Sequence, residues 1–201
     1  MSSPNRRAAQ ALETKRLIVD AARRLFTEQG YGATSVAQIA EAAGVAVPTV
    51  YASVGTKPTL LRLLLDRIDE EAGVAELARE LRSSSDAGRV LALQVRITRQ
   101  LVERCGDIIA ALGSAAGVEP EMAGALAAGM RRHRAGAEAT VGRIAELGKL
   151  RAGVDVEEAA AVLATLSAPG VYATLTGEYG WSFDRCEAWI ERTLRQQLLA
   201  R

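Results

Sequence analysis

The segment SVAQIAEAAGVAVPTVYASV, from Ser35 to Val54, constrains the fold of this chain more than any other. Within it, Ala40 precedes Gly44 by four residues and Val50 follows Gly44 by six. Two helices that cross steeply approach closely only where the contact residue is small. A glycine lets the chain leave the first helix in the left-handed conformation. This spacing predicts a helix-turn-helix in which Val50 anchors the second helix, so that its outer face is free to enter a DNA major groove.

The segments around this motif extend it into a small helical domain. From Thr14, apolar residues recur at helical spacing until Gly30 ends the run, which predicts a first helix. Ser35 followed by Gln38 fits a capping box for the next helix, with Thr34 as a competing N-cap. Residues 47–53 form the predicted third helix, and a fourth, linker helix is expected from residue 57 to about residue 81.

The remainder of the chain predicts helices only, so the expected fold class is all-α. No stretch alternates with a period of two for long enough to indicate a strand. Further helices are expected at 86–105, 107–116, 120–150, 156–179 (kinked at Pro169-Gly170) and 183–200, which makes about nine in all. The predicted organisation is a flexible basic arm at 1–11, a DNA-binding domain at 12–57, the linker helix at 57–81, and a helical domain at 82–201.

The distribution of charge agrees with a nucleic-acid-binding N-terminal part. The net charge of the whole chain is only +1. Residues 1–57, however, hold seven Lys and Arg against four Asp and Glu, whereas residues 58–201 hold eighteen against twenty. A positive excess at the predicted motif favours contact with DNA phosphates.

The composition gives little support to catalysis or to a membrane location. One histidine and two distant cysteines, Cys105 and Cys186, leave no metal or nucleophile cluster, so we expect no cofactor, no metal and no enzyme. Both cysteines are expected to be small, buried or half-buried reduced thiols. The longest apolar stretches fall short of the roughly 18–20 residues of a membrane span, and no secretory signal opens the chain. We therefore expect a cytoplasmic protein with no membrane partner.

Residues 21–61, AARRLFTEQGYGATSVAQIAEAAGVAVPTVYASVGTKPTLL, resemble the TetR family of bacterial transcriptional regulators. The resemblance rests on the elements LF, GY, TS, IA, AGV, TVY and TK-x-x-LL at these spacings, after the approach helix from Thr14. It implies a three-helix DNA-binding domain, a connecting fourth helix and a helical C-terminal domain that dimerises through its last two helices. It also implies a transcriptional repressor that is released from a near-palindromic operator in double-stranded DNA by a small-molecule inducer.

Ten residues are predicted to contact DNA. Lys57 is the clearest, because a cation in the first turn of a helix opposes the helix dipole unless an anion such as a phosphate shares the site. The family motif also implies a phosphate-contacting lysine here, and the alternative is a Lys57 that points to solvent. The other candidates are Thr34, Ser35, Gln38, Ala46, Val47, Pro48, Thr49, Tyr51 and Ser53. Thr34 and Tyr51 have alternative roles in helix capping and in packing.

Base recognition is expected to be unusual. Residues 46–54 contain no Arg, Lys, Asn or Gln, which are the usual bidentate readers of bases. Ala46, Val47 and Pro48 offer apolar contacts with thymine methyl groups, although Val47 could instead pack beside Val50. Many members of the family carry a polar residue at position 47 and a serine at position 46. We therefore expect specificity to depend on apolar contacts, water and DNA shape.

The C-terminal part is expected to form a homodimer through residues 156–200. Apolar faces on its last two predicted helices support this, with completion of the monomer core as the alternative. The residues on those faces are Ala159, Ala160, Val162, Leu163, Leu166, Val171, Leu175, Trp189, Ile190, Leu194, Leu198 and Leu199.

An inducer pocket, if present, is expected among the helices between residues 86 and 150. The candidate lining residues are Ile97, Leu101, Met122, Leu126, Met130 and Tyr172, each of which could equally be ordinary core. A helical interaction protein or lipid or ligand carrier that no longer binds DNA remains an alternative function.

Overall fold

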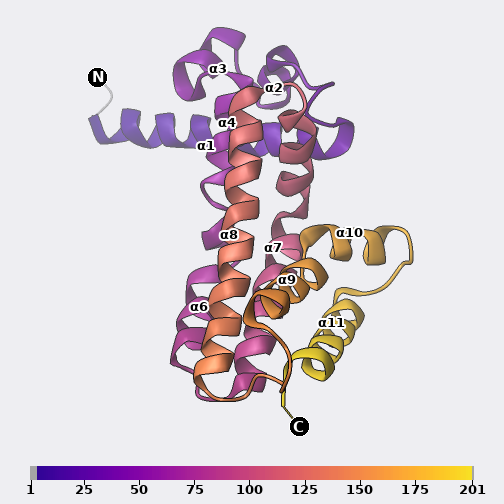
Figure 1. The fold of residues 1–201 in the computed structure, drawn as a ribbon. Helices are drawn as coiled ribbons and strands as arrows, with labels where there is room; N and C mark the ends of the chain where they lie inside the picture. The colour runs from indigo at the N-terminus through magenta and orange to yellow at the C-terminus, as the bar shows by residue number, and fades with distance from the viewer. Residues whose placement is uncertain (1–3, 201) are drawn as a thin grey trace. The chain divides into compact units, whose positions relative to one another are not determined.

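The computed structural model describes residues 4–200, and every regular element in that range is a helix (Figure 1). The helices are α1 (Pro4–Gln29), α2 (Val36–Ala42), α3 (Val47–Val54), α4 (Lys57–Leu65), α5 (Ile68–Glu71), α6 (Val74–Ser83), α7 (Ala87–Ala116), α8 (Pro120–Glu146), α9 (Val156–Leu166), α10 (Pro169–Gly177) and α11 (Phe183–Leu198). Backbone pairing outside helices includes one isolated bridge between Leu150 and Leu199. The all-α prediction is confirmed.

The chain divides into two compact units. The first unit contains the residues up to Ile68 together with Asp107–Leu126, and the second contains Asp69–Gly106 together with the residues from Ala127 onward. Helices α7 and α8 therefore each contribute to both units. Within α7, Cys105 leaves helical geometry, with φ −130° and ψ 17°, directly before the point where the chain passes from one unit to the other.

The first helix begins earlier than the sequence predicts. α1 starts at Pro4, so the expectation of a flexible arm is wrong for residues 4–11, while residues 1–3 lie outside the described part. Proline is well suited to a first helical turn, and the Ala, Arg, Gln, Leu and Glu residues that follow are strong helix formers. The basic side chains Arg6 and Arg7 are thus carried on a helix and are exposed.

The expected linker helix from residue 57 to 81 is not continuous. α4 ends at Leu65, a single turn follows as α5, and α6 begins only after Gly73. Gly73 has a φ of 68°, a left-handed conformation that interrupts a right-handed helix and that glycine adopts at little cost. This break also raises the number of helices above the nine expected.

The predicted helix over 156–179 is also divided. α9 ends at Leu166, and α10 begins at Pro169, because proline disfavours helical geometry in the residue before it. The segment Val156–Gly177 is 22 residues long, and its 18-residue window of mean hydropathy 1.4 is only 28% buried. By length and composition it could cross a membrane, so the expectation that no stretch reaches that size is wrong; a single such segment is weak evidence for a span.

The core of the second unit explains where the predicted dimer faces go. Its buried members include Ala159, Ala160 and Leu163 from α9 and Ile190, Leu194 and Leu198 from α11, packed with Val90, Leu93 and Val141 of α7 and α8. These six residues of the predicted faces complete the monomer core, so they are not free for a partner. The half-buried members of the predicted faces are Val162, Leu166, Val171, Leu175, Trp189 and Leu199.

Candidate nucleic-acid interface

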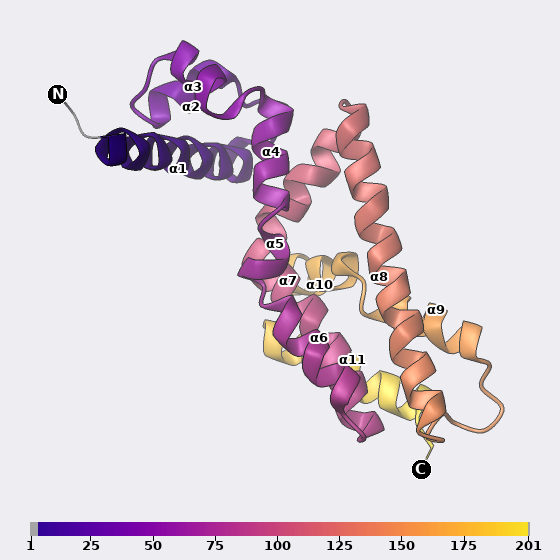
Figure 2. The same ribbon diagram turned by 90° about the vertical axis from the view of Figure 1, so that its left-hand side faces the viewer.

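The turn between α2 and α3 has the predicted geometry. Gly44 adopts a φ of 68°, and Val45 N–H donates to the Ala40 carbonyl at 2.9 Å across the turn. Ala40 is 2% exposed and Val50 is fully buried, as expected for the contact between the two helices. α2 and α3 pack on each other and on α1, and both lie on one side of α1 in Figures 1 and 2.

The outer face of α3 is apolar and accessible. Val47 is 37% exposed and Tyr51 52% exposed, whereas Val50 and Val54 point into the core. The alternative in which Val47 packs beside Val50 is therefore wrong. Among the other candidates on this helix, Ala46 and Pro48 are exposed, and Thr49 and Ser53 are half-buried.

The start of α2 is fixed by the predicted capping box. The Ser35 hydroxyl accepts the Gln38 backbone N–H at 3.2 Å, and the Gln38 side-chain oxygen accepts the Ser35 N–H at 2.8 Å. Both residues are exposed, but their side-chain oxygens are engaged in the cap. Gln38 can therefore contact DNA only through the N–H groups of its side-chain amide.

Thr34 is removed from the candidate DNA contacts. Its side chain is 2% exposed, and its hydroxyl donates to the Gly30 carbonyl at 2.8 Å while it accepts from the Gln29 side chain at 3.2 Å. A hydroxyl that is enclosed in this way cannot reach a phosphate. It does not cap α2 either, because Ser35 does so.

The Lys57 ammonium rests against the backbone of the first unit, and the residue is half-buried. Lys57 Nζ donates to the backbone carbonyls of Tyr31 and Thr34, both at 3.0 Å, and lies 4.2 Å from the centre of the Tyr31 ring. Carbonyl oxygens and an aromatic face both attract a cation. These groups offset the unfavourable placement of the charge at the start of α4, so an anion is not required to explain it.

Two further contacts tie α1 and its following loop to the α7–α8 corner, residues 107–122. Arg23 forms a two-point ion pair with Asp107, at 2.6 Å from Nε and 3.0 Å from Nη2. The Tyr31 hydroxyl donates to Glu119 at 3.2 Å. Burial raises the pKa of Tyr31, and the charge of Glu119 adds to that rise. Neither Glu119 nor Asp107 could be recognised from the sequence, because their partners lie 88 and 84 residues away.

The six candidate inducer-pocket residues do not form one group within a unit. Met122 and Leu126 belong to the first unit, and Met122 is fully buried there. Tyr172 is core of the second unit, with its hydroxyl donating to the Val95 carbonyl at 3.2 Å. Met130 is 54% exposed, and Ile97 and Leu101 are half-buried. Because Met122 and Tyr172 are core residues of different units and Met130 is exposed, the predicted pocket lined by all six candidates is not supported.

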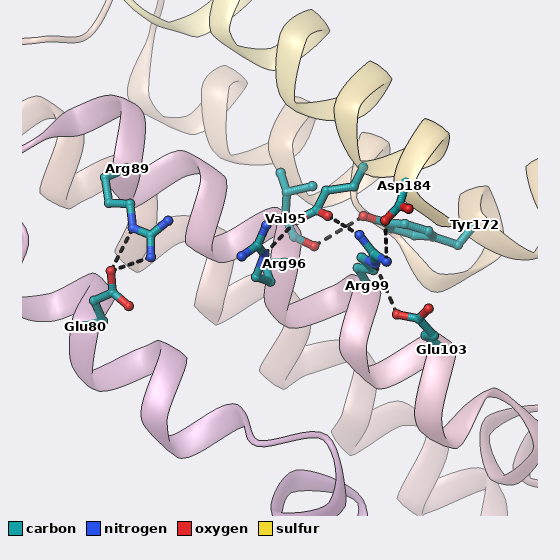
Figure 3. Close-up of polar contacts among 9 residues, drawn as sticks. Glu80, Arg89, Val95, Arg96, Arg99, Glu103, Tyr172 and Asp184 are labelled. Atoms are coloured by element: carbon teal, nitrogen blue, oxygen red, sulfur yellow. Dashed lines mark hydrogen bonds and ion pairs between the residues drawn. The ribbon is translucent and has the colours of Figure 1, made fainter. Parts of the chain in front are cut away.

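The second unit instead shows a polar depression of about 330 Å³ on α7, lined by Arg96, Arg99, Gln100, Glu103 and Arg104. Figure 3 shows Arg99 directed at both Glu103 and Asp184, at 3.1 and 2.6 Å. Arg96 and Arg99 both also pair with Glu187, which is buried. The charges of this cluster are matched internally, so it stabilises the contact of α7 with α11.

Two short helices that pack together, with a left-handed glycine between them and an accessible outer face, are typical of a helix-turn-helix. The family model described as "Bacterial regulatory proteins, tetR family" matches residues 18–64. The chain is 47% identical over 49 residues to the HTH-type transcriptional repressor ComR of Escherichia coli (strain K12), a match that covers 24% of this chain and 23% of that protein. Over residues 18–64 the chain is thus similar to the tetR family of bacterial regulatory proteins.

Solved structures share the fold over nearly the whole chain. NalD, the secondary repressor of the MexAB-OprM multidrug efflux pump in Pseudomonas aeruginosa, superposes with a TM-score of 0.73 at 22% identity, over 95% of this chain and 98% of that one. A regulator from Saccharomonospora viridis in complex with choline gives 0.74 at 21% identity, over 94% and 99%. At these identities the likeness establishes the fold alone.

Proposed function

We propose that this protein is a sequence-specific DNA-binding transcriptional regulator, acting in the cytoplasm as a repressor that a small molecule releases. The observation that carries the proposal is the accessible outer face of α3, held by the buried Val50 and the turn at Gly44. The match of residues 18–64 to the tetR family and the similarity to the repressor ComR support it. The activity is one of binding, without a catalytic step.

In this proposal α3 enters the major groove and reads bases mainly through its apolar surface. Ala46, Val47 and Pro48 supply contacts to thymine methyl groups, and Tyr51 and Thr49 donate to phosphates. Two of the three N–H donors of the Lys57 ammonium are used by the Tyr31 and Thr34 carbonyls. The third donates to a phosphate near the start of α4. Ser35, Gln38 and Ser53 border this surface.

The test is selection of bound sequences from a random duplex library by the full-length protein. We expect enrichment of a near-palindromic site, since two-fold dimers read paired half-sites. Pro48→Ala should change which bases are preferred, whereas Lys57→Ala should weaken binding to all sequences alike and lower the salt slope by about one for each DNA-binding domain. A protein that enriches no sequence would point to the alternative, a carrier or interaction protein without DNA binding.

Dimerisation is proposed through α9, α10 and the exposed side of α11. The supporting observation is that an 18-residue window of the apolar segment Val156–Gly177 is only 28% buried in one chain. Its exposed side consists largely of small residues, which allow two helices to approach closely: Ala161, Thr165, Gly170, Ala173, Thr174 and Gly177. A second copy that covers this face removes apolar surface from water.

Ligand binding is proposed for the second unit. The comparison proteins include regulators in complex with triclosan and with choline, which supports the idea without identifying a ligand here. A polar spot in the apolar core between α7 and α8 offers an anchor: Gln94 accepts the Thr140 hydroxyl at 3.2 Å, and the buried Thr98 hydroxyl has no hydrogen-bond partner. A ligand that satisfied Thr98 would recover the free energy that an unpaired buried hydroxyl costs, about 1–3 kcal/mol. Ile97 and Leu101 are the adjacent apolar candidates.

A further inference from the structure

We propose that Glu119 and Tyr31 are positioning residues for the phosphate contact of Lys57. The three residues form a continuous set of contacts within the first unit, here called the Glu119–Tyr31–Lys57 relay. The inference rests on the proposed DNA-binding function and adds a control point to it.

The first contact of the relay fixes the Tyr31 ring. The Tyr31 side chain is fully buried, and its hydroxyl donates to the Glu119 carboxylate at 3.2 Å. Glu119 is itself held at the corner, because its N–H donates to Ala115 at 2.9 Å at the end of α7 and its carbonyl accepts from Met122 at 3.0 Å at the start of α8. A displacement of this corner therefore moves Tyr31.

The second contact fixes the Lys57 ammonium. Nζ lies 4.2 Å from the centre of the Tyr31 ring and donates to the Tyr31 carbonyl at 3.0 Å. A carboxylate that accepts the phenol hydrogen increases the electron density of the ring, which strengthens its attraction for the cation on its face. Glu119 thus influences both the place of the lysine charge and the strength with which it is held.

The corner is one of two parts of the first unit that continue covalently into the second, and the other is the end of the N-terminal segment at Ile68. α7 enters it after Gly106, and α8 leaves it after Leu126. A shift of α7 or α8 would therefore displace Glu119, and with it the relay, before it displaces α3. The sequence-independent part of DNA affinity would then respond, since Lys57 contacts phosphate and no base.

The test compares two carboxylates that are two residues apart. Glu119→Ala breaks the relay, whereas Glu121→Ala removes the same charge from an exposed side chain whose ion-pair partner is Arg62, at 3.6 Å. Full-length variants are titrated against mixed-sequence duplex DNA and against a duplex selected by the wild-type protein, over a range of salt concentrations. We expect Glu119→Ala to weaken both affinities by about three- to tenfold, the factor that corresponds to one hydrogen bond. Glu121→Ala should change both affinities by less, because Glu121 acts on Tyr31 through its charge alone.

Two additional variants separate positioning from folding. Tyr31→Phe keeps the ring over Lys57 and removes only the hydroxyl, and it should weaken binding as Glu119→Ala does. In a Lys57→Met background Glu119→Ala should have no further effect, because the contact that it positions is already lost. Thermal midpoints identify any variant that fails to fold. If Glu119→Ala fails to fold, the DNA affinity of Tyr31→Phe tests the relay in its place.

The outcomes distinguish this inference from the proposed function. If the wild-type protein binds neither duplex, the DNA-binding function itself is wrong. If it binds, and Glu119→Ala and Glu121→Ala behave alike or Tyr31→Phe binds as the wild type does, the relay alone is overturned. An equal effect of Glu119→Ala with and without Lys57 would also overturn it.

Discussion

Gly44 shows how one residue decides the geometry of the reading surface. Its φ of 68° lies in the left-handed region, where a side chain meets its own backbone. An added Cβ would meet no other atom within 4 Å, so the cost of a substitution comes from the backbone conformation alone. The α2–α3 angle, and with it the direction of α3, depends on that conformation.

Gly44→Ala should therefore destabilise the protein by about 1–2 kcal/mol, which corresponds to a fall of several degrees in the thermal midpoint. The matched control is Gly32→Ala, at an exposed position that is also free of neighbours within 4 Å and does not have a positive φ. Differential scanning calorimetry of both variants checks the prediction. Equal midpoints for the two variants would mean that the left-handed conformation carries no cost here.

At the scale of elements, the first unit is held together by contacts that join α1 to the corner of α7 and α8. The Arg23–Asp107 pair is the strongest of these by geometry, with two charge-assisted hydrogen bonds and side chains that are 28% and 23% exposed. Burial alone would raise the pKa of Asp107, but the hydrogen bond and charge of Arg23 outweigh it, so that pKa is lowered in the folded protein.

Because the folded pKa of Asp107 is lowered, its contribution to stability is fully present above the unfolded value of 3.8 and is lost as pH falls through the folded value. Asp107→Asn should cost about 1.5–3 kcal/mol at neutral pH, the range for hydrogen bonds to charged groups, and the difference from wild type should shrink below pH 4. Urea unfolding at several pH values measures it. Asp20→Asn is the control, since its pair with Arg16 is exposed and should contribute little.

At the scale of the whole molecule, the apolar segment Val156–Gly177 is what a single chain leaves incompletely covered. One reading helix contacts only a few base pairs, so in the proposed dimer a second copy would both cover this surface and double the site that is read. The two roles are linked, because a monomer would lose affinity for a near-palindromic duplex even with an intact first unit.

Ala173→Arg should disrupt the dimer, because Ala173 is exposed on α10 and a buried guanidinium without a partner is costly in an interface. Ala139→Arg, at an exposed position of α8, is the control. Sedimentation at micromolar concentration should give a dimer for the wild type and for Ala139→Arg, and a monomer for Ala173→Arg. A monomeric wild-type protein would remove the dimer proposal.

Local features were predictable because their causes lie within a few residues. The glycine turn at Gly44, the capping box of Ser35 and Gln38, and the division of α3 into an inner and an outer face all follow from neighbouring positions. Two other local predictions were wrong. The helical start at Pro4 and the break at Gly73 were missed, because a short basic segment and a single glycine are each compatible with two conformations.

The sequence by itself determined the helical class, the helix-turn-helix and the residues that its outer face presents, because backbone preference and helical periodicity act over at most a few turns. Only the tertiary structure decided that Lys57 rests on Tyr31, that Thr34 is enclosed, and that Leu163 and Leu194 complete the core of one chain. These outcomes depend on which distant segments meet. Lys57 and Glu119 lie 26 and 88 residues from Tyr31, and no local preference specifies a contact at that separation.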